Sequence, residues 1–550
     1  MNQDIKFRKF GVMIDNSRNA VMKVDTVKEY IDIISKLGYN CLSLYTEDTY
    51  EIKNQPYFGH NRGRYSQDEL KIIDKYAIEK GVEIIPCIQT LGHLNAIMRW
   101  KCYSEICDCN DILLADDERT YSLIDDMFST LSETFTSRTV NIGMDEANMV
   151  GRGKYYDIHG DRNKLEILVE HLHKVAKIAA KYNFEIIMWG DMFLHLLKEN
   201  TDASDEAAYV GGGDLKGITI PDSLREAIPE NVNIIYWDYY SRNIKHYDQN
   251  IETYLAIKEN LWFAGGIWTW TGFIPHNRYS METSNAAITS CIKNDVKDVI
   301  FTIWGDHGAE TSRFAILPSL YYISQLAKGI NDIDIIKSGF LKEFGISFDD
   351  YMLIDLPLSL TASETRMVNA DRYLLYNDVF MGLFDSKVTE EDGKGYYAAA
   401  RNLEKIPATY KYHYMFESAQ KLCDVLALKC DIGLRTRKAY ESKNKYELTE
   451  LIKDYDKLLD LIRDFYTAFE KQWMIENKPH GFDVQDIRIG GLIQRISHCK
   501  NRLIDYINGD LSVIEELEEP VLDESCNGAN KGEHKWCRDK WSNIVTTNII

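Results

Sequence analysis

The chain has 550 residues, which is too long for a single hydrophobic core, so we expect more than one domain. With 45% hydrophobic and 27% charged residues, its composition is that of a folded globular protein. The chain has 64 basic and 85 acidic residues, which gives a net charge of −21. A surface of this sign repels phosphate backbones and argues against nucleic acid as a partner.

The N-terminal residues contain no apolar segment followed by a cleavage site, and no run of about 18 apolar residues occurs in the chain. The sequence therefore predicts neither a secretory signal nor a membrane span. Its 11 cysteines are odd in number and scattered, which favours free thiols in a reducing compartment. We expect a cytoplasmic protein without a membrane partner.

The first half of the chain alternates short β-rich runs with helical stretches. Helix boundaries are marked by a capping-box pattern at Ser66 and Glu69 and by the stop signals Gly38 and Gly81. Eight strands with helical crossovers predict a (β/α)8 barrel, whereas the alternative, a doubly wound open sheet, usually has fewer strands. The eight runs are 10–14, 41–45, 82–88, 139–143, 184–189, 232–237, 262–267 and 299–304.

The pattern changes in the second half, where long helical stretches such as 410–440 and 448–476 dominate and β-rich runs become scarce. We therefore predict two parts of an α/β protein. Residues 1–325 form the catalytic (β/α)8 barrel, a TIM barrel, and residues 326–550 form a mainly α-helical C-terminal region.

Candidate functional residues follow the predicted strands, because active sites of such barrels lie at the carboxyl ends of the strands. Carboxylates recur there and suit acid–base catalysis. Five of the ten tryptophans also lie there, and indole faces pack on the apolar face of a sugar ring. Together they indicate a carbohydrate site. In strand order, the residues are Asp15 and Arg18, Glu47 and Asp48, Gly92 and His93, Asp145 and Glu146, Trp189 and Asp191, Trp237, Asp238 and Tyr239, Trp268 and Trp270, and Trp304, Asp306 and Glu310.

Each of these residues also has an ordinary structural interpretation. A single tryptophan at a strand end often only packs against the core, His93 is typical of a hydrogen-bonded structural histidine, and Arg18 of a surface cation or one half of an ion pair. An Asp-Glu pair in a loop is usually solvated. However, Asp145 and Glu146 directly follow a β-rich run, and five tryptophans coincide with predicted strand ends, which together favour a site.

Five segments resemble glycoside hydrolase family 20, the β-N-acetylhexosaminidases. The motif that precedes the catalytic Asp-Glu pair of the family is similar to RTVNIGMDEA at 138–147, although the usual Gly-Gly is Gly143-Met144 here. The other segments are GVMIDNSRNA at 11–20, NCLSLYTEDTYEI at 40–52, IIPCIQTLGH at 84–93 and TIWGDHGAE at 302–310. The closest resemblance is to a divergent cytoplasmic bacterial branch of the family.

The resemblance implies retaining, substrate-assisted catalysis without a cofactor or a metal. A retaining glycosidase normally holds two carboxyl groups roughly 5–5.5 Å apart on either side of the anomeric carbon, which adjacent residues cannot readily do. The adjacent pair is understandable if the nucleophile is the acetamido group of the substrate. Glu146 would then be the general acid and base, and Asp145 would orient the acetamido group.

The resemblance also implies a binding pocket for the sugar. Trp189, Trp237 and Trp304 would surround the acetamido methyl group, and Tyr239 would donate to the acetamido oxygen, with Tyr236 and Tyr240 as alternatives. In addition, Arg18 would bind the 3- and 4-hydroxyls, Asp306 or Glu310 the 4- and 6-hydroxyls, and His93 would support Asp145 or a hydroxyl. The expected substrate is a small oligosaccharide with a terminal β-linked N-acetylglucosamine or N-acetylgalactosamine, and a homodimer is the expected assembly.

Two other functions remain open from the sequence. One is a metal-dependent hydrolase on the same barrel, with His93, Asp191 and His307 as ligands, although the sequence contains no H-E-x-x-H and no His-x-His on the first strand. The other is a sugar-binding protein that has lost catalysis. Chelator sensitivity would separate the first from a glycosidase, and turnover would separate the second.

Overall fold

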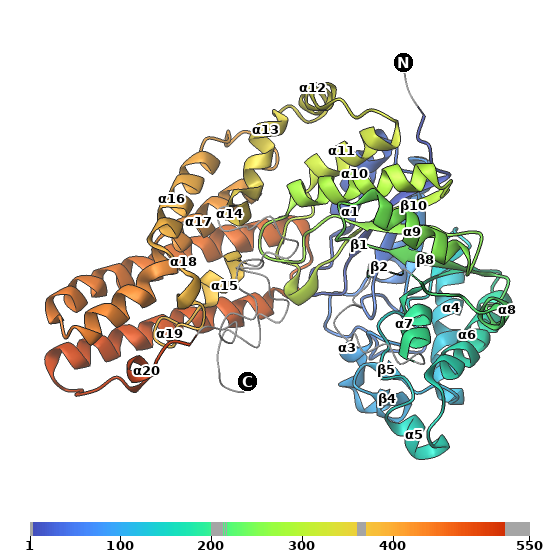
Figure 1. Cartoon of the computed structure of the whole chain (residues 1–550), viewed down its shortest axis with the longest axis horizontal. Helices are drawn as coiled ribbons and strands as arrows, with labels where there is room; N and C mark the ends of the chain where they lie inside the picture. Colours follow the sequence, from blue (N-terminus) through green and yellow to red (C-terminus); the bar gives the residue numbers. More distant parts are fainter. Residues whose placement is uncertain (1–3, 200–212, 214, 216, 360–369, 523–550) are drawn as a thin grey trace. The chain divides into compact units, whose positions relative to one another are not determined.

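The computed structural model describes residues 4–199, 213, 215, 217–359 and 370–522. In these residues, eight parallel strands close into a barrel in chain order (Figure 1). Each of the eight predicted runs coincides with one strand, so the predicted (β/α)8 barrel is confirmed. The strands are β1 (Lys9–Asp15), β2 (Cys41–Tyr45), β3 (Glu83–Cys87), β6 (Thr139–Asn141), β7 (Glu185–Trp189), β8 (Val232–Trp237), β9 (Trp262–Gly266) and β10 (Asp298–Ile303).

A small antiparallel hairpin, which the sequence analysis did not predict, interrupts the connection between β3 and β6. It consists of β4 (Cys107–Cys109) and β5 (Ile112–Leu113). Strands this short carry no readable alternation of apolar and polar residues, so periodicity could not reveal them.

Helices cover the barrel, and two of them begin or end as predicted. Ser66 and Glu69 form the capping box of α2, and Gly38 adopts a left-handed φ of 97° at the end of α1. The helices in the order of the chain are α1 (Val24–Leu37), α2 (Gln67–Glu79), α3 (Asn95–Met98), α4 (Glu118–Thr134), α5 (Lys154–His159), α6 (Lys164–Lys181), α7 (Asp191–Glu199), α8 (Asp222–Ala227), α9 (Ile244–Leu255), α10 (Asn277–Lys293) and α11 (Leu317–Ala327), with a 3-10 turn at Lys101–Ile106.

The chain divides into two compact units, which we call the barrel unit and the helical unit. The barrel unit comprises Met1–Ile267, Tyr279–Trp304 and Ser319–Ile336, and the helical unit comprises Trp268–Arg278, Gly305–Pro318 and Lys337–Ile550. The sequence analysis placed a single boundary at residue 325. The loops that follow β9 and β10 belong to the helical unit.

The C-terminal part is mainly helical, as predicted. Its two longest helices, α17 (His413–Glu441) and α18 (Lys445–Glu476), pack along each other, and α18 also packs along α19 (Phe482–Asn508) (Figure 1). No helix in the described ranges combines the length and the apolarity needed to cross a membrane. The helices are α12 (Ile333–Phe344), α13 (Phe348–Tyr351), α14 (Leu356–Ser359), α15 (Ala370–Tyr376), α16 (Glu390–Leu403), α17 (His413–Glu441), α18 (Lys445–Glu476), α19 (Phe482–Asn508) and α20 (Glu515–Glu518), with 3-10 turns at Asp306–Gly308, Met352–Asp355 and Asp385–Lys387.

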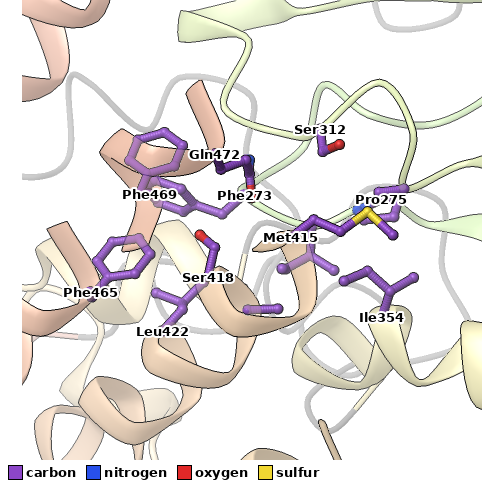
Figure 2. Close-up of a pocket in the computed structure, with 13 residues that line it drawn as sticks. Phe273, Pro275, Ser312, Ile354, Met415, Ser418, Leu422, Phe465, Phe469 and Gln472 are labelled. Carbon is purple, nitrogen blue, oxygen red and sulfur yellow. The ribbon is translucent and has the colours of Figure 1, made fainter. Parts of the chain in front are cut away.

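A small pocket of the helical unit is lined mainly by residues with apolar side chains (Figure 2). Aromatic side chains of α18, Phe465 and Phe469, face Met415 and Leu422 of α17 across it. The lining is largely hydrocarbon, so we interpret the pocket as a packing defect and not as a ligand site.

Candidate active site

Asp145 and Glu146 lie in the loop that follows β6, at the carboxyl end of the barrel. The backbone enters this loop through Gly143, whose φ is 72°. A Cβ atom there would lie 2.0 Å from Oε1 of Gln89, so a glycine is required for close approach as well as for conformation. Met144 and Glu146 also have left-handed φ values, 67° and 50°. Such strain is typical of functional loops that the surrounding structure holds in place.

The two carboxylates occupy different environments. Asp145 is buried, with 8% of its surface exposed, whereas the side chain of Glu146 is 49% exposed. Nε2 of Gln89 donates a hydrogen bond of 2.8 Å to Oδ1 of Asp145, and the backbone N–H of Met144 donates to Oε1 of the same Gln89. The buried carboxylate is thus fixed in orientation, while the glutamate reaches the open side of the loop.

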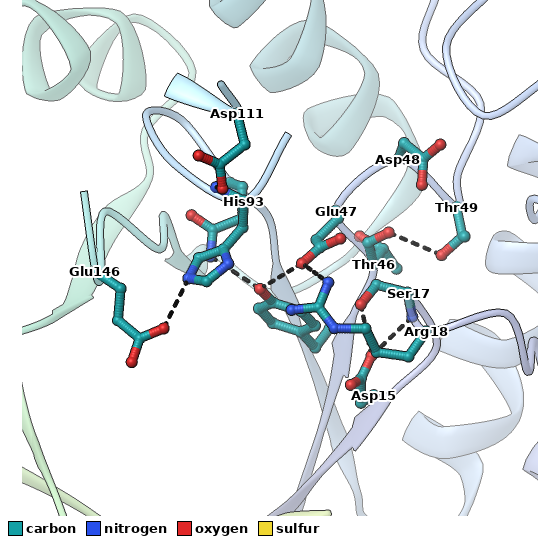
Figure 3. A network of polar contacts seen from close by, with 12 residues as sticks. Asp15, Ser17, Arg18, Thr46, Glu47, Asp48, Thr49, His93, Asp111 and Glu146 are labelled. Carbon is teal, nitrogen blue, oxygen red and sulfur yellow. Dashed lines mark hydrogen bonds and ion pairs between the residues drawn. The ribbon is translucent and has the colours of Figure 1, made fainter. Parts of the chain in front are cut away.

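His93 lies beside both carboxylates. Its Nε2 is 3.2 Å from Oδ2 of Asp145 and 3.6 Å from Oε2 of Glu146, and Figure 3 shows the ring next to Glu146. Burial by itself would lower the pKa of His93, but the negative charge of the adjacent Asp145 raises that pKa to about 10. Burial opposes the ionisation of Asp145. The positive charge of His93 and the hydrogen bond from Gln89 outweigh that effect, so the pKa of Asp145 is lowered.

A chain of hydrogen bonds connects Asp145, through Gln89, Tyr45 and Glu47, to Arg18 across the ends of β3, β2 and β1. Nε2 of Gln89 also donates to the hydroxyl of Tyr45 (3.0 Å), and that hydroxyl donates to Oε1 of Glu47 (3.0 Å). The guanidinium of Arg18 pairs with the same oxygen at 2.6 Å. Burial raises the pKa of Glu47, and the charge of Arg18 opposes that rise. These contacts bring together four of the candidate residues, Arg18, His93, Asp145 and Glu146.

Sequence reasoning missed Gln89 and Tyr45 as members of this network. Both lie inside or next to predicted strands, where an amide or a phenol carries no chemical signature of its own. Only the closure of the barrel places Gln89 between two strands and beside Gly143.

Aromatic side chains line the ends of β7, β8 and β10 in the barrel unit. The rings of Trp189 and Trp304 lie 6.1 Å apart, and Tyr45 meets Trp304 edge-on at 4.8 Å. The rings of Trp237 and Tyr239 stack at 5.1 Å. These surfaces can pack against the hydrocarbon parts of a sugar and exclude water from polar contacts.

The three tyrosines of the segment 236–240 have different surroundings. The ring of Tyr236 stacks on Tyr254 of α9, and its hydroxyl donates to Asp238, so it faces the helix that covers β8. The backbone carbonyl of Tyr240 accepts a hydrogen bond from the hydroxyl of Tyr279. Tyr239 instead stacks on Trp237, which makes it the tyrosine of this segment that packs on a predicted pocket residue.

Asp191, the first residue of α7, is a further buried carboxylate of the barrel unit. Burial and the negative charge of Asp145 raise the pKa of Asp191 to about 7. The sequence predicts Asp191 as one of the carboxylates at the strand ends and, in the alternative function, as a metal ligand. Among the described residues, no group of three His, Cys, Asp or Glu side chains is arranged to hold a metal ion, so the geometry does not favour the metal-dependent alternative.

The acidic residues after β10, Asp306 and Glu310, belong to the helical unit. Glu310 is fully buried and forms an ion pair with the equally buried Arg372. A second arginine, Arg488, lies 3.1 Å from Oε1 of Glu310. Asp306 is only partly buried. Glu310 is thus engaged with two arginines inside the helical unit.

A barrel that carries an ionised, oriented aspartate next to an accessible glutamate and a set of aromatic rings has the features of a glycoside hydrolase. Comparison with known families agrees. The model of the glycosyl hydrolase family 20 catalytic domain matches residues 6–295, and that of the Glycoside Hydrolase 20C C-terminal domain matches residues 349–536. The chain belongs to glycoside hydrolase family 20.

Several known proteins are similar to parts of this chain. Hexosaminidase D of Bos taurus is 22% identical over 54% of this chain and 81% of its own length, and Beta-hexosaminidase 3 of Arabidopsis thaliana is 25% identical over 34% and 38%. Among solved structures, the family 20 exo β-N-acetylglucosaminidase of Vibrio harveyi, in complex with N-acetylglucosamine, has 15% identity and a TM-score of 0.45 over 64% of this chain and 59% of its own. The chain thus covers less than two thirds of the Arabidopsis and Vibrio proteins.

Proposed function

We propose that this enzyme is an exo-acting, retaining β-N-acetylhexosaminidase that removes a terminal β-linked N-acetylglucosamine or N-acetylgalactosamine. The observation that carries the proposal is that two adjacent carboxylates have different environments. Asp145 is buried, kept ionised by His93 and held by Gln89, whereas Glu146 is accessible. A fixed anion can orient an acetamido group, and an accessible carboxyl group can exchange protons with a leaving group and with water.

In the first proposed step, Asp145 accepts a hydrogen bond from the acetamido N–H and stabilises the positive charge that develops there. The acetamido oxygen attacks the anomeric carbon and forms a C–O bond while the glycosidic C–O bond breaks. Glu146 gives its proton to the departing oxygen, which leaves as an alcohol. The product of this step is an oxazolinium ion attached to no protein residue, as expected for a substrate-assisted exception to the two-carboxylate scheme.

In the second step, the Glu146 carboxylate takes a proton from water, and the water oxygen attacks the anomeric carbon. The bond from this carbon to the acetamido oxygen breaks, which regenerates the acetamido group and leaves the sugar with its β configuration. Two inversions at one carbon give net retention. Glu146 returns to its protonated form, so the cycle is balanced without a cofactor.

The remaining predicted residues are proposed to bind the sugar. Trp189, Trp237 and Trp304 would pack around the acetamido methyl group, and Tyr239 would donate to the acetamido oxygen. The support for Tyr239 over its neighbours is its stacking on Trp237. In addition, Arg18 would bind the 3- and 4-hydroxyls, and His93 would maintain the charge of Asp145.

The test is hydrolysis of the 4-nitrophenyl β-glycosides of N-acetylglucosamine and of glucose by wild type, Glu146→Gln and Asp145→Asn. We expect turnover of only the N-acetylated sugar, with kcat reduced on the order of 10²–10⁴-fold in Glu146→Gln because general acid catalysis is lost. Glu133→Gln, a change at an exposed surface ion pair with Lys53, is the matched control and should retain activity. Equal turnover of the glucoside would show that the nucleophile is a protein carboxylate and would overturn the role of Asp145.

We also propose that the enzyme works in the cytoplasm on small oligosaccharides and forms a homodimer. The nine cysteines among the described residues are free thiols, a state that fits a reducing compartment. Cell fractionation would test the location, and light scattering of the purified protein would test the dimer.

A further inference from the structure

We propose that Asp191 is a positioning residue that holds the catalytic loop so that the carboxyl group of Glu146 reaches the glycosidic oxygen. This inference rests on the proposed function and adds to it a residue outside the predicted catalytic pair. It is drawn from the contacts of the Asp191 carboxylate within the barrel unit.

Both carboxylate oxygens of Asp191 accept hydrogen bonds. Oδ2 accepts the backbone N–H of Glu146 at 3.1 Å, and Oδ1 accepts the indole N–H of Trp237 at 3.2 Å. Asp191 is 6% exposed, so these hydrogen bonds are shielded from competing water. One carboxylate therefore ties together the segments that follow three successive strands, β6, β7 and β8.

The position of Asp191 is itself fixed. Gly190 connects β7 to α7, and its backbone N–H donates to the carbonyl of Ile235 on β8 at 3.0 Å. A Cβ atom on Gly190 would lie 2.4 Å from Cγ2 of Ile234, so the turn packs directly on β8. The carboxylate at the start of α7 is thus held by two barrel strands and can act as a rigid anchor.

Glu146 needs such an anchor because its φ of 50° is unfavourable for a residue with a side chain. Its carbonyl accepts the N–H of Asn148 at 2.8 Å, which closes a tight turn, and its N–H is the group held by Asp191. If the hydrogen bond to Asp191 is lost, the backbone can relax and the carboxyl group of Glu146 moves. A displacement of about 1 Å in a catalytic group can cost on the order of 100-fold in rate.

The experiment is Asp191→Asn, assayed with the phenyl, 4-nitrophenyl and 2,4-dinitrophenyl β-glycosides of N-acetylglucosamine. The amide has one acceptor oxygen where two donors now bind, so one of them is left unsatisfied. A poor leaving group depends most on protonation by Glu146. We therefore expect kcat to fall roughly 10- to 100-fold for the phenyl glycoside, and by less than about threefold for the dinitrophenyl glycoside.

A double-mutant cycle separates action through Glu146 from a general effect on folding. With the 4-nitrophenyl substrate, kcat of the double variant Asp191→Asn/Glu146→Ala should stay within about threefold of Glu146→Ala alone. The matched control is Asp74→Asn. Asp74 is a buried carboxylate of α2 that accepts hydrogen bonds from the backbone N–H and the hydroxyl of Thr136. In Asp74→Asn, the dependence of kcat on the leaving group should be the same as in wild type.

Equal losses for all leaving groups, or full additivity in the cycle, would overturn the proposal. If Asp191→Asn does not fold, Asp191→Glu replaces it, because it keeps both acceptor oxygens but displaces them by one methylene, and the same dependence on the leaving group is expected. An inactive wild type would contradict the proposed function itself. If the wild type is active and Asp191→Asn has the same kcat with every leaving group, only the role of Asp191 is contradicted.

Discussion

At the scale of single residues, the site depends on how each charged group determines the protonation of its neighbours. Asp145 is buried, and burial alone would favour its neutral form, which could not stabilise a developing positive charge. The imidazolium of His93 and the amide of Gln89 reverse that preference. The same pairing keeps His93 protonated well above neutral pH. The aspartate and the histidine are therefore best understood as one charged unit.

Replacement of His93 by glutamine tests this pairing. Removal of the positive charge raises the pKa of Asp145, so the ionised form that the mechanism needs is lost at a higher pH than in wild type. We expect the acid limb of the profile of kcat/KM against pH to move to higher pH by about one pH unit or more. His173→Gln, at an exposed position of α6, is the control. An unchanged acid limb in His93→Gln would show that His93 does not control the charge of Asp145.

At the scale of elements, local sequence signals determine where several helices begin and end. In α2, the hydroxyl of Ser66 accepts the N–H of Glu69 at 3.1 Å, and Oε2 of Glu69 accepts the N–H of Ser66 at 2.8 Å. These bonds satisfy donors that a helix start otherwise leaves unpaired. Because the signal lies within four residues, it is readable without knowledge of the fold.

Ser66→Ala should lower the free energy of unfolding by about 1 kcal/mol through loss of this cap, without changing kcat. Urea unfolding followed by circular dichroism measures the effect. Ser104→Ala, which removes an exposed hydroxyl that donates to the carbonyl of Lys101, serves as comparison and should change stability by less than about 0.5 kcal/mol. Equal stability of Ser66→Ala and wild type would mean that water replaces the cap at no cost.

At the scale of the whole molecule, the helical unit is held together by charged groups from distant parts of the sequence. Glu310, from the loop after β10, pairs with Arg372 of α15 and Arg488 of α19, and its backbone carbonyl accepts the side-chain amide of Gln472 of α18. Arg372 also donates to the carbonyl of Asp306. The loop that carries Asp306 is therefore fixed by three helices of its own unit.

Glu310→Ala should destabilise the helical unit by roughly 3–5 kcal/mol, because it leaves the guanidinium of Arg372 buried without its carboxylate. Hydrogen exchange should show loss of protection in peptides from α15, α18 and α19. Glu391→Ala, which breaks an exposed pair with Lys394, is the control and should change little. Unchanged exchange in Glu310→Ala would show that the buried pair does not stabilise the unit.

Much of the fold could be predicted because its signals are local. β-rich runs bounded by turns marked all eight barrel strands, long periodic stretches marked the helical C-terminal part, and both predictions are confirmed. The family was also readable, since the segment around Asp145 and Glu146 is contiguous in the sequence, and the match to glycoside hydrolase family 20 confirms it. The roles of the individual site residues stay predictions.

The sequence by itself determined the barrel, the helical C-terminal part and the carboxylate pair, because each is specified by neighbouring residues. Only the tertiary structure decided which distant side chains surround that pair. Gln89 after β3 and Asp191 at the start of α7 contact the pair, and Tyr45 at the end of β2 is connected to it through Gln89. Glu310 meets Arg372 across 62 positions of sequence. The physical reason is that a hydrogen bond or an ion pair depends on distance in space. Periodicity along the chain indicates which face of a helix or strand is buried, but not which side chain of another element packs against that face.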